Sequence, residues 1–258
     1  MARRTAILRE NAEESSSSPG YRESDAMKPS SLGTVIVFSL LVVSSGASLA
    51  AEKEVHWGEA HDERGELVYR EKHSVTREGE RVITSLTASI SPADQVIATM
   101  ESDYSRNLSM PTYVFEDLRR GYREGLREEN GEYIIFKKTK DGEEETEAIT
   151  NTEDVFSCQG WHYYLVNNLA VLERENVELN LILPSELRAL PFEIQGVRSE
   201  GDRVEAVLKL NHWLFRYFAP TLQLVYDSES RKLVEYRGIS NISDSEGNRQ
   251  DVRIVYEY

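Results

Sequence analysis

Residues 154–173, DVFSCQGWHYYLVNNLAVLE, form the one long stretch of this chain whose pattern is typical of a helix. Its large apolar side chains recur at spacings of four, four and three residues and so share one helical face: Trp161, Leu165, Leu169 and Leu172. Asn151 or Thr152 is a suitable N-cap, although Gly160 disfavours a helix by about 1 kcal/mol relative to alanine. The sequence predicts one long central helix.

Strand-like segments lie on both sides of this helix. They are rich in Val, Ile, Thr and Tyr and are separated by turn-forming residues. Alternation is clearest in 81–90, where one face carries Val82, Thr84, Leu86 and Ala88. Residues 115–127 contain two glycines and several arginines, which predicts an exposed, kinked strand. The other strand candidates are 67–76, 95–103, 132–139, 144–150, 177–183, 192–197, 203–210, 222–226, 232–239 and 251–258.

This order of elements predicts a mainly β (α+β) fold. We expect a strongly curved antiparallel sheet or half-barrel of about ten strands packed around the one long helix. Strands and helices do not alternate, so a parallel sheet is not expected. No linker interrupts residues 54–258, and we therefore expect 51–258 to form a single β-rich domain. The acidic run 143–145 follows an Asp-Gly hairpin signal and predicts a solvated sheet edge; a cation site is the alternative.

The first 50 residues differ from the rest of the chain. Residues 1–26 are polar without apolar periodicity, which predicts disorder. Residues 27–50 have the pattern of a secretory signal peptide, with Lys28, an apolar run over 34–43 and small residues before a cleavage site at Ala51. The apolar run is far shorter than the roughly 20 residues of a membrane-spanning helix, so no stable transmembrane anchor is expected. A signal peptide normally begins its chain, so we expect translation to start at Met27.

The charge of the chain excludes one broad class of partner. The net charge is −15, and residues 51–258 retain all of it because the first 50 residues carry equal numbers of basic and acidic side chains. Binding to nucleic acid depends on clustered Lys and Arg, so a nucleic-acid partner is not expected. Cys158 is the only cysteine, which rules out a disulfide within one chain.

The familiar catalytic motifs are missing. There is no GxSxG elbow, HExxH motif, phosphate-binding glycine loop or dinucleotide fingerprint. Cys158 and His162 are four residues apart, so on a helix they would share a face and could form a thiol–imidazole pair. The alternative is a small buried thiol beside a core histidine, and we favour it because no oxyanion donor can be assigned. No catalytic residue, metal or cofactor is therefore predicted.

Two other polar clusters could bind a cation. His56 and His61 lie near the start of the predicted domain within an acidic segment, so a transition-metal site is conceivable there. A frayed or edge segment is the better interpretation. Asp244, Glu246 and Asn248 alternate around a glycine but lack the remaining ligands of a calcium loop, which predicts a plain turn.

The aromatic stretch 211–219, NHWLFRYFA, has three interpretations. It could pack in the core, line an apolar cavity, or enter a membrane interface. A curved sheet around one helix leaves a concavity that apolar ligands can use. The predicted ligand-lining side chains are Trp161, Leu165 and Leu169 from the helix, with Trp213 and Phe215 from the aromatic stretch.

Three segments resemble an uncharacterised family of exported bacterial, specifically proteobacterial, proteins. They are MPTYVFEDLRRGYREG at 110–125, LILPSELRALPFEI at 181–194 and LQLVYDSESRKLVEYRGISNISDSEGNRQDVRIVYEY at 222–258. No activity comes with this resemblance. The predicted architecture also resembles the periplasmic lipoprotein-carrier fold, which implies a Gram-negative periplasm and an acyl-chain ligand; fold alone does not establish function.

Three functions follow as hypotheses. The first is an exported periplasmic protein that binds an apolar ligand, such as a lipid or acyl chain, without catalysis. The second is a structural or protein-interaction module of the cell envelope, which predicts a filled core. The third, which we favour least, is a thiol-dependent enzyme that uses Cys158 and His162.

Overall fold

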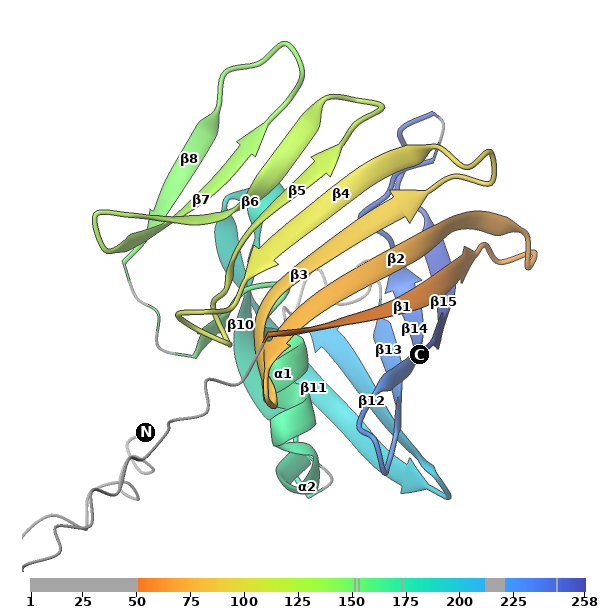
Figure 1. Cartoon of the computed structure of the whole chain (residues 1–258). Coiled ribbons are helices and arrows are strands. Elements are labelled where there is room, and N and C mark those ends of the chain that lie inside the picture. The colour runs from red at the N-terminus through yellow and green to blue at the C-terminus, as the bar shows by residue number, and fades with distance from the viewer. Residues whose placement is uncertain (1–50, 151, 153, 173, 212–220, 245) are drawn as a thin grey trace, which may run out of the picture. The chain divides into compact units, whose positions relative to one another are not determined.

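The computed structural model describes residues 51–258 except 151, 153, 173, 212–220 and 245, and only the backbone of 170 and 196–199. Fifteen strands in this part of the chain form one sheet (Figure 1). The strands of the N-terminal half are β1 (Glu52–His61), β2 (Leu67–Glu78), β3 (Arg81–Ile90), β4 (Val96–Asp103), β5 (Thr112–Asp117), β6 (Tyr122–Glu129), β7 (Glu132–Lys138) and β8 (Glu145–Ile149). Those of the C-terminal half are β9 (Val155–Phe156), β10 (Val177–Leu183), β11 (Arg188–Glu200), β12 (Arg203–Leu210), β13 (Leu222–Asp227), β14 (Leu233–Ile239) and β15 (Asp251–Glu257).

The sheet is a meander whose first and last strands pair in its middle. Its order runs from β8 down to β1, then from β15 down to β9. Every pair is antiparallel except the short β9–β10 pair, which is parallel. Gly58 of β1 lies opposite Tyr256 of β15, and this central pair joins the N-terminal and C-terminal halves.

The mainly β, curved antiparallel fold is confirmed, but the expected number of about ten strands is too low. The segment around His56 and His61 was expected to be frayed or at a sheet edge, yet it forms β1, which has a strand on each side. Its alternating pattern was hidden by small and charged residues.

Residues 115–127 form parts of two strands, β5 and β6, instead of one kinked strand. Gly121 in the turn between them has a φ of +61°, a conformation that glycine adopts without strain.

The prediction of one long helix is wrong. Val155 and Phe156 form β9, and the helix α1 (Trp161–Asn167) starts only after Gly160, so neither Asn151 nor Thr152 can cap it. A Cβ at Gly160 would lie 1.8 Å from the Ser109 carbonyl oxygen, so this close approach requires glycine. A second short helix, α2 (Leu169–Leu172), follows, and the 3₁₀ turn η1 (Pro184–Glu186) joins β10 to β11.

The sheet curls until its two ends pack against each other through side chains. Leu126 and Ile135 from β6 and β7 share a buried cluster with Val155 and Ile182 from β9 and β10. The Lys137 ammonium also donates to the Ser185 carbonyl at 3.2 Å. We call this contact the seam. No helix in the described part of the chain is long and apolar enough to cross a bilayer.

The predicted solvated edge is confirmed. β8 stands at one end of the sheet, and four of its five residues are exposed. Among them are Glu145, which ends the acidic run 143–145, and Glu147. Charges along a free edge discourage pairing with another chain.

Candidate functional site

The concave side of the sheet encloses a cavity of about 1640 Å³. Its lining comes from both halves of the sheet and from α1. Two parts of the lining differ in chemistry. The leucine wall comprises Leu181, Leu183, Leu190, Phe192, Leu210, Leu222 and Leu224, and the polar wall comprises Glu71, His73, Ser85, Thr87, Ser89 and Glu124.

The leucine wall belongs to the half of the sheet that α1 covers. Inward residues of β10–β13 form one buried cluster with Trp161 and Leu165 of α1. Leu165 and Leu208 are both fully buried. The helix therefore lies over this half of the sheet, with apolar side chains on both sides of the contact.

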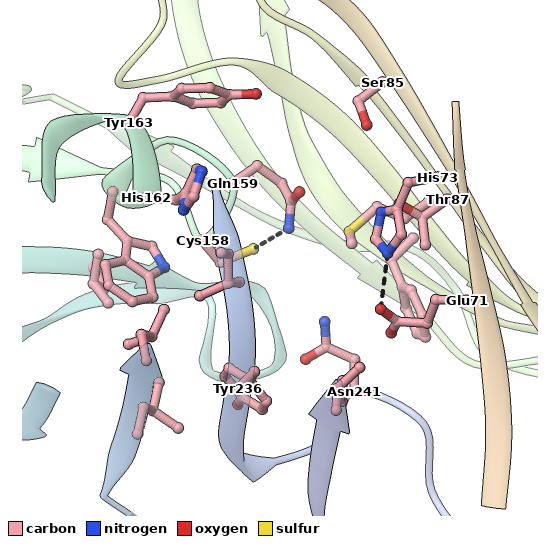
Figure 2. A pocket seen from close by; sticks show the side chains of 18 of the residues that line it. Glu71, His73, Ser85, Thr87, Cys158, Gln159, His162, Tyr163, Tyr236 and Asn241 are labelled. Carbon is pink, nitrogen blue, oxygen red and sulfur yellow. Dashed lines mark hydrogen bonds and ion pairs between the residues drawn. The ribbon is translucent and has the colours of Figure 1, made fainter. Parts of the chain in front are cut away.

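The polar wall is organised by strand register. His56 of β1, His73 of β2 and Thr87 of β3 lie directly opposite one another in neighbouring strands. Thr87 Oγ1 is 2.9 Å from His73 Nδ1, and His73 Nε2 is 2.9 Å from Glu71 Oε2. Figure 2 shows Glu71, His73 and Thr87 on one side of the pocket. A hydroxyl, an imidazole and a carboxylate thus form one hydrogen-bonded chain.

The inward face of β3 is the polar one. Ser89 and Thr87 are buried on this face, whereas Leu86 on the other face is 41% exposed. Val82 is buried near the start of the strand, beyond a register irregularity between β2 and β3. The face that carries Leu86 would ordinarily turn toward a core. The reversal indicates that the inward face of β3 meets a cavity and not a packed layer.

Two histidines in the lining stay neutral. Burial, with a further contribution from neighbouring His73, lowers the pKa of His56 to about 4. Burial, with a contribution from the charge of Arg77, lowers the pKa of His162 to about 4. His162 Nδ1 lies 3.0 Å from the hydroxyl of Tyr226, and the two rings stack. His56 Nδ1 is buried without a hydrogen-bond partner in the described part of the chain.

A nucleophilic pair needs a thiol with a lowered pKa and a protonated imidazole, and Cys158 and His162 provide neither. Burial raises the pKa of the Cys158 thiol to about 11, and the lowered pKa of His162 disfavours an imidazolium. Cys158 also precedes α1, so the expected shared helical face does not form. Its sulfur lies 3.9 Å from the side-chain nitrogen of Gln159. Both residues line the cavity, but a thiolate–imidazolium pair is disfavoured there.

The predicted lining residues separate into three groups. Trp161 lines the cavity. Leu165 and Leu169 instead belong to the cluster between α1, α2 and the sheet. Trp213 and Phe215 lie outside the described residues, as do most of the aromatic stretch 211–219.

The other candidate cation clusters have plain structural roles. His56 lines the cavity, whereas His61 ends β1 and takes no part in the lining. Asp244 Oδ1 accepts hydrogen bonds from the backbone N–H groups of Glu246 and Asn248, which confirms the predicted turn. In the described ranges, no group of three or more His, Cys, Asp or Glu side chains could hold a metal ion.

Sequence reasoning missed the polar wall. Its signal was present in 85–89, where Ser85, Thr87 and Ser89 alternate within a strand whose other face is more apolar. Glu71 and His73 follow the same spacing of two in β2. Such polar alternation is ordinarily attributed to solvent exposure, so the signal was not specific.

Comparison with known proteins adds little to this description. No protein-family model matches the chain, and no curated protein matches it. Among solved structures, it is similar to a β-barrel-like protein of the domain of unknown function DUF1849 from Brucella abortus. The TM-score is 0.46 at 9% identity, covering 81% of this chain and 96% of the other. At that level the likeness assigns neither a family nor an activity.

Proposed function

We propose that this chain is an exported, non-catalytic binding protein that takes up an apolar or amphipathic ligand, such as a lipid or acyl chain, in its cavity. The observation that carries this proposal is the cavity of about 1640 Å³ with one apolar wall. Ligand pockets commonly measure about 300–1,000 Å³. The space is therefore sufficient for a ligand with a long chain.

The leucine wall supplies the favourable free energy for such a ligand. Burying apolar surface stabilises a complex by about 0.8 kcal/mol per methylene group. Wall residues such as Leu222 and Leu210 are only partly buried in the unliganded chain, so they retain surface that a ligand can cover. An acyl chain would replace water along this wall.

The two other hypotheses are less well supported. An interaction module without a ligand predicts a filled core, and the cavity argues against it. A thiol-dependent enzyme needs a reactive thiolate, and the raised pKa of Cys158 opposes one. Ligand binding is the function that uses the cavity.

Binding can be tested by native mass spectrometry of gently purified protein and by titration with a fluorescent fatty-acid probe. We expect a co-purified or added lipid to be retained. Leu222→Gln places an amide in the leucine wall and should weaken binding of the probe. Leu86→Gln is the matched control, because Leu86 is 41% exposed on the other face. Absence of both a co-purified lipid and probe binding would overturn the proposal.

Export is the part of this proposal that rests on the signal-peptide pattern of residues 27–50 and on the family resemblance. We propose cleavage before Ala51 and residence in the periplasm, as the resemblance to exported bacterial proteins implies. Sequencing the N-terminus of the protein isolated from cells tests this. A mature chain that begins anywhere within 27–50 would contradict the cleavage site, and a precursor peptide from 1–26 would contradict the start at Met27.

A further inference from the structure

Glu71 lies in a regular grid of inward side chains where the first and last strands pair. One row across the sheet contains Tyr69, Ala60, Ile254 and Tyr236. The next row contains Glu71, Gly58 and Tyr256. The strand register therefore places one carboxylate and three tyrosines in two adjacent rows.

Small residues on β1 make this arrangement possible. A Cβ at Gly58 would lie 2.8 Å from Cε1 of Tyr256, so the tyrosine ring occupies the space above the glycine. From there, the hydroxyl of Tyr256 donates to Glu71 Oε2 at 3.4 Å. The neighbouring inward residue of β1, Ala60, is also small and is fully buried. The middle strand of the group thus makes room for rings from its neighbours.

The negative charge of Glu71 affects the pKa of all three tyrosines. Burial raises the pKa of Tyr69, Tyr236 and Tyr256, and the negative charge of Glu71 raises it further in each case. The hydroxyl of Tyr69 forms a hydrogen bond with Ser240 Oγ. The hydroxyl of Tyr236 donates to the Ile239 carbonyl, and that of Tyr256 donates to Glu71. All three tyrosines and Glu71 line the cavity. Together they form what we call the tyrosine–carboxylate site.

Within this site the charge of Glu71 has weak compensation. His73 is the one basic side chain that pairs with it in the described part of the chain. His73 Nε2 lies 2.9 Å from Glu71 Oε2 and His73 Nδ1 lies 2.9 Å from Thr87 Oγ1, so both ring nitrogens have a partner. No lysine or arginine among the described residues pairs with Glu71. The Glu71 side chain is only 13% exposed. A largely buried carboxylate whose one basic partner is a histidine, and not a permanently charged lysine or arginine, can gain from a bound cation.

We infer that the tyrosine–carboxylate site binds the positively charged ammonium head of an amphipathic ligand whose chain lies along the leucine wall. Aromatic rings grouped around a carboxylate are the combination that recognises organic ammonium ions, through cation–π attraction and ion pairing. An anionic head would be repelled by Glu71, and a neutral head would gain only hydrogen bonds. This inference deepens the proposed function and rests on it.

The experiment compares three probes that share a decyl chain: decyltrimethylammonium, decanol and decanoate. Their affinities are measured by isothermal titration calorimetry below the concentrations at which they form micelles. We expect decyltrimethylammonium to bind about tenfold more tightly than decanol, as one cation–π and ion-pair site would provide. Decanoate should bind most weakly.

Variants separate the site from the overall negative charge of the protein. Glu71→Gln should abolish the preference for ammonium while retaining decanol binding. Glu101→Gln removes a glutamate from the outer face, where the exposed Glu101 lies opposite Leu86, and should leave the preference intact. Tyr256→Phe keeps the ring and should retain most of the preference, whereas Tyr256→Leu should reduce it. Thermal unfolding of each variant verifies that it is folded.

The outcomes distinguish this inference from the proposed function. Equal binding of decyltrimethylammonium and decanol, or an unchanged preference in Glu71→Gln, overturns the ammonium site while the proposed function stands. Failure of all three probes to bind overturns both. An equal loss of preference in Glu101→Gln would show a general charge effect and would also overturn the site.

Discussion

The leucine wall and the polar wall occupy the same concave surface but meet different neighbours. Inward side chains of β10–β13 pack against α1, and that contact buries Leu165 completely. Inward side chains of β2 and β3, such as His73 and Thr87, line the cavity and bond to one another. The strands that α1 covers therefore have an apolar inward face, whereas β2 and β3, which line the cavity, have a polar one.

This difference has a physical cause. A polar side chain beneath a packed helix would lose its hydrogen bonds to water, which costs about 1–3 kcal/mol when no partner replaces them. The same side chain beside an open cavity can bond to a neighbour, to water or to a ligand. The two short helices of the described residues, α1 and α2, can cover only part of so wide a sheet. The uncovered part is where polar groups remain available for binding.

The largest effect should come from the packed layer between α1 and the half of the sheet that carries the leucine wall. Leu165→Ala removes a fully buried side chain from the contact between α1 and the sheet. We expect a loss of about 2–5 kcal/mol in the free energy of unfolding, because a cavity remains in a packed layer. Chemical denaturation measures it. Leu86→Ala, on the exposed outer face, should change stability by less than about 0.5 kcal/mol, and a similar loss in both variants would contradict the comparison.

The seam between the two halves can be probed through Cys158. Burial raises the pKa of this thiol to about 11, so the thiolate fraction at neutral pH is roughly a hundredfold below that of a free cysteine. We expect alkylation of the native protein to be slower than that of the unfolded protein by about this factor. Mass spectrometry follows the reaction. Rapid labelling under native conditions would contradict the raised pKa of the thiol.

The loss of stability on acidification tests both halves of the sheet, because each half contains one histidine with a lowered pKa. His56 and His162 both have a pKa lowered to about 4. Between pH 6.5 and 4 the unfolded chain therefore takes up protons that the folded chain does not, so stability falls as the pH falls. The slope is at most about 1.4 kcal/mol per pH unit for each histidine.

Thermal melting across this pH range measures that slope. His162→Gln should make it shallower by removing the contribution of the half covered by α1, and His56→Gln should do so for the other half. An acid sensitivity unchanged in both variants would show that other groups are responsible. Above pH 6.5 both histidines are neutral in either state, so they add no pH dependence there.

The smallest effect should come from the polar wall. Thr87→Val keeps the shape of the side chain but removes the hydroxyl that bonds His73. We expect a loss of about 1 kcal/mol in unfolding free energy, measured by denaturation. Thr84→Val on the exposed face of the same strand is the control and should be neutral or slightly stabilising. A loss as large as that of Leu165→Ala would show that the polar wall is packed like the leucine wall.

Local patterns predicted much of the fold. The β class, the curved antiparallel sheet, the Asp244 turn and the charged edge at β8 all follow from alternation and turn chemistry over a few residues. The helix prediction failed because Val155 and Phe156 fit a helical period as well as a strand. Only the approach of Gly160 to Ser109 distinguishes them, and that contact joins residues about fifty positions apart.

The sequence by itself determined that inward and outward residues alternate in β2 and β3, but not which set faces inward. That choice depends on β1, which pairs with β15 and joins the two halves of the sheet. Tertiary structure alone decided that Glu71 is surrounded by Tyr69, Tyr236 and Tyr256. The reason is geometric: these residues come from three strands, and only their register brings the rings to the carboxylate.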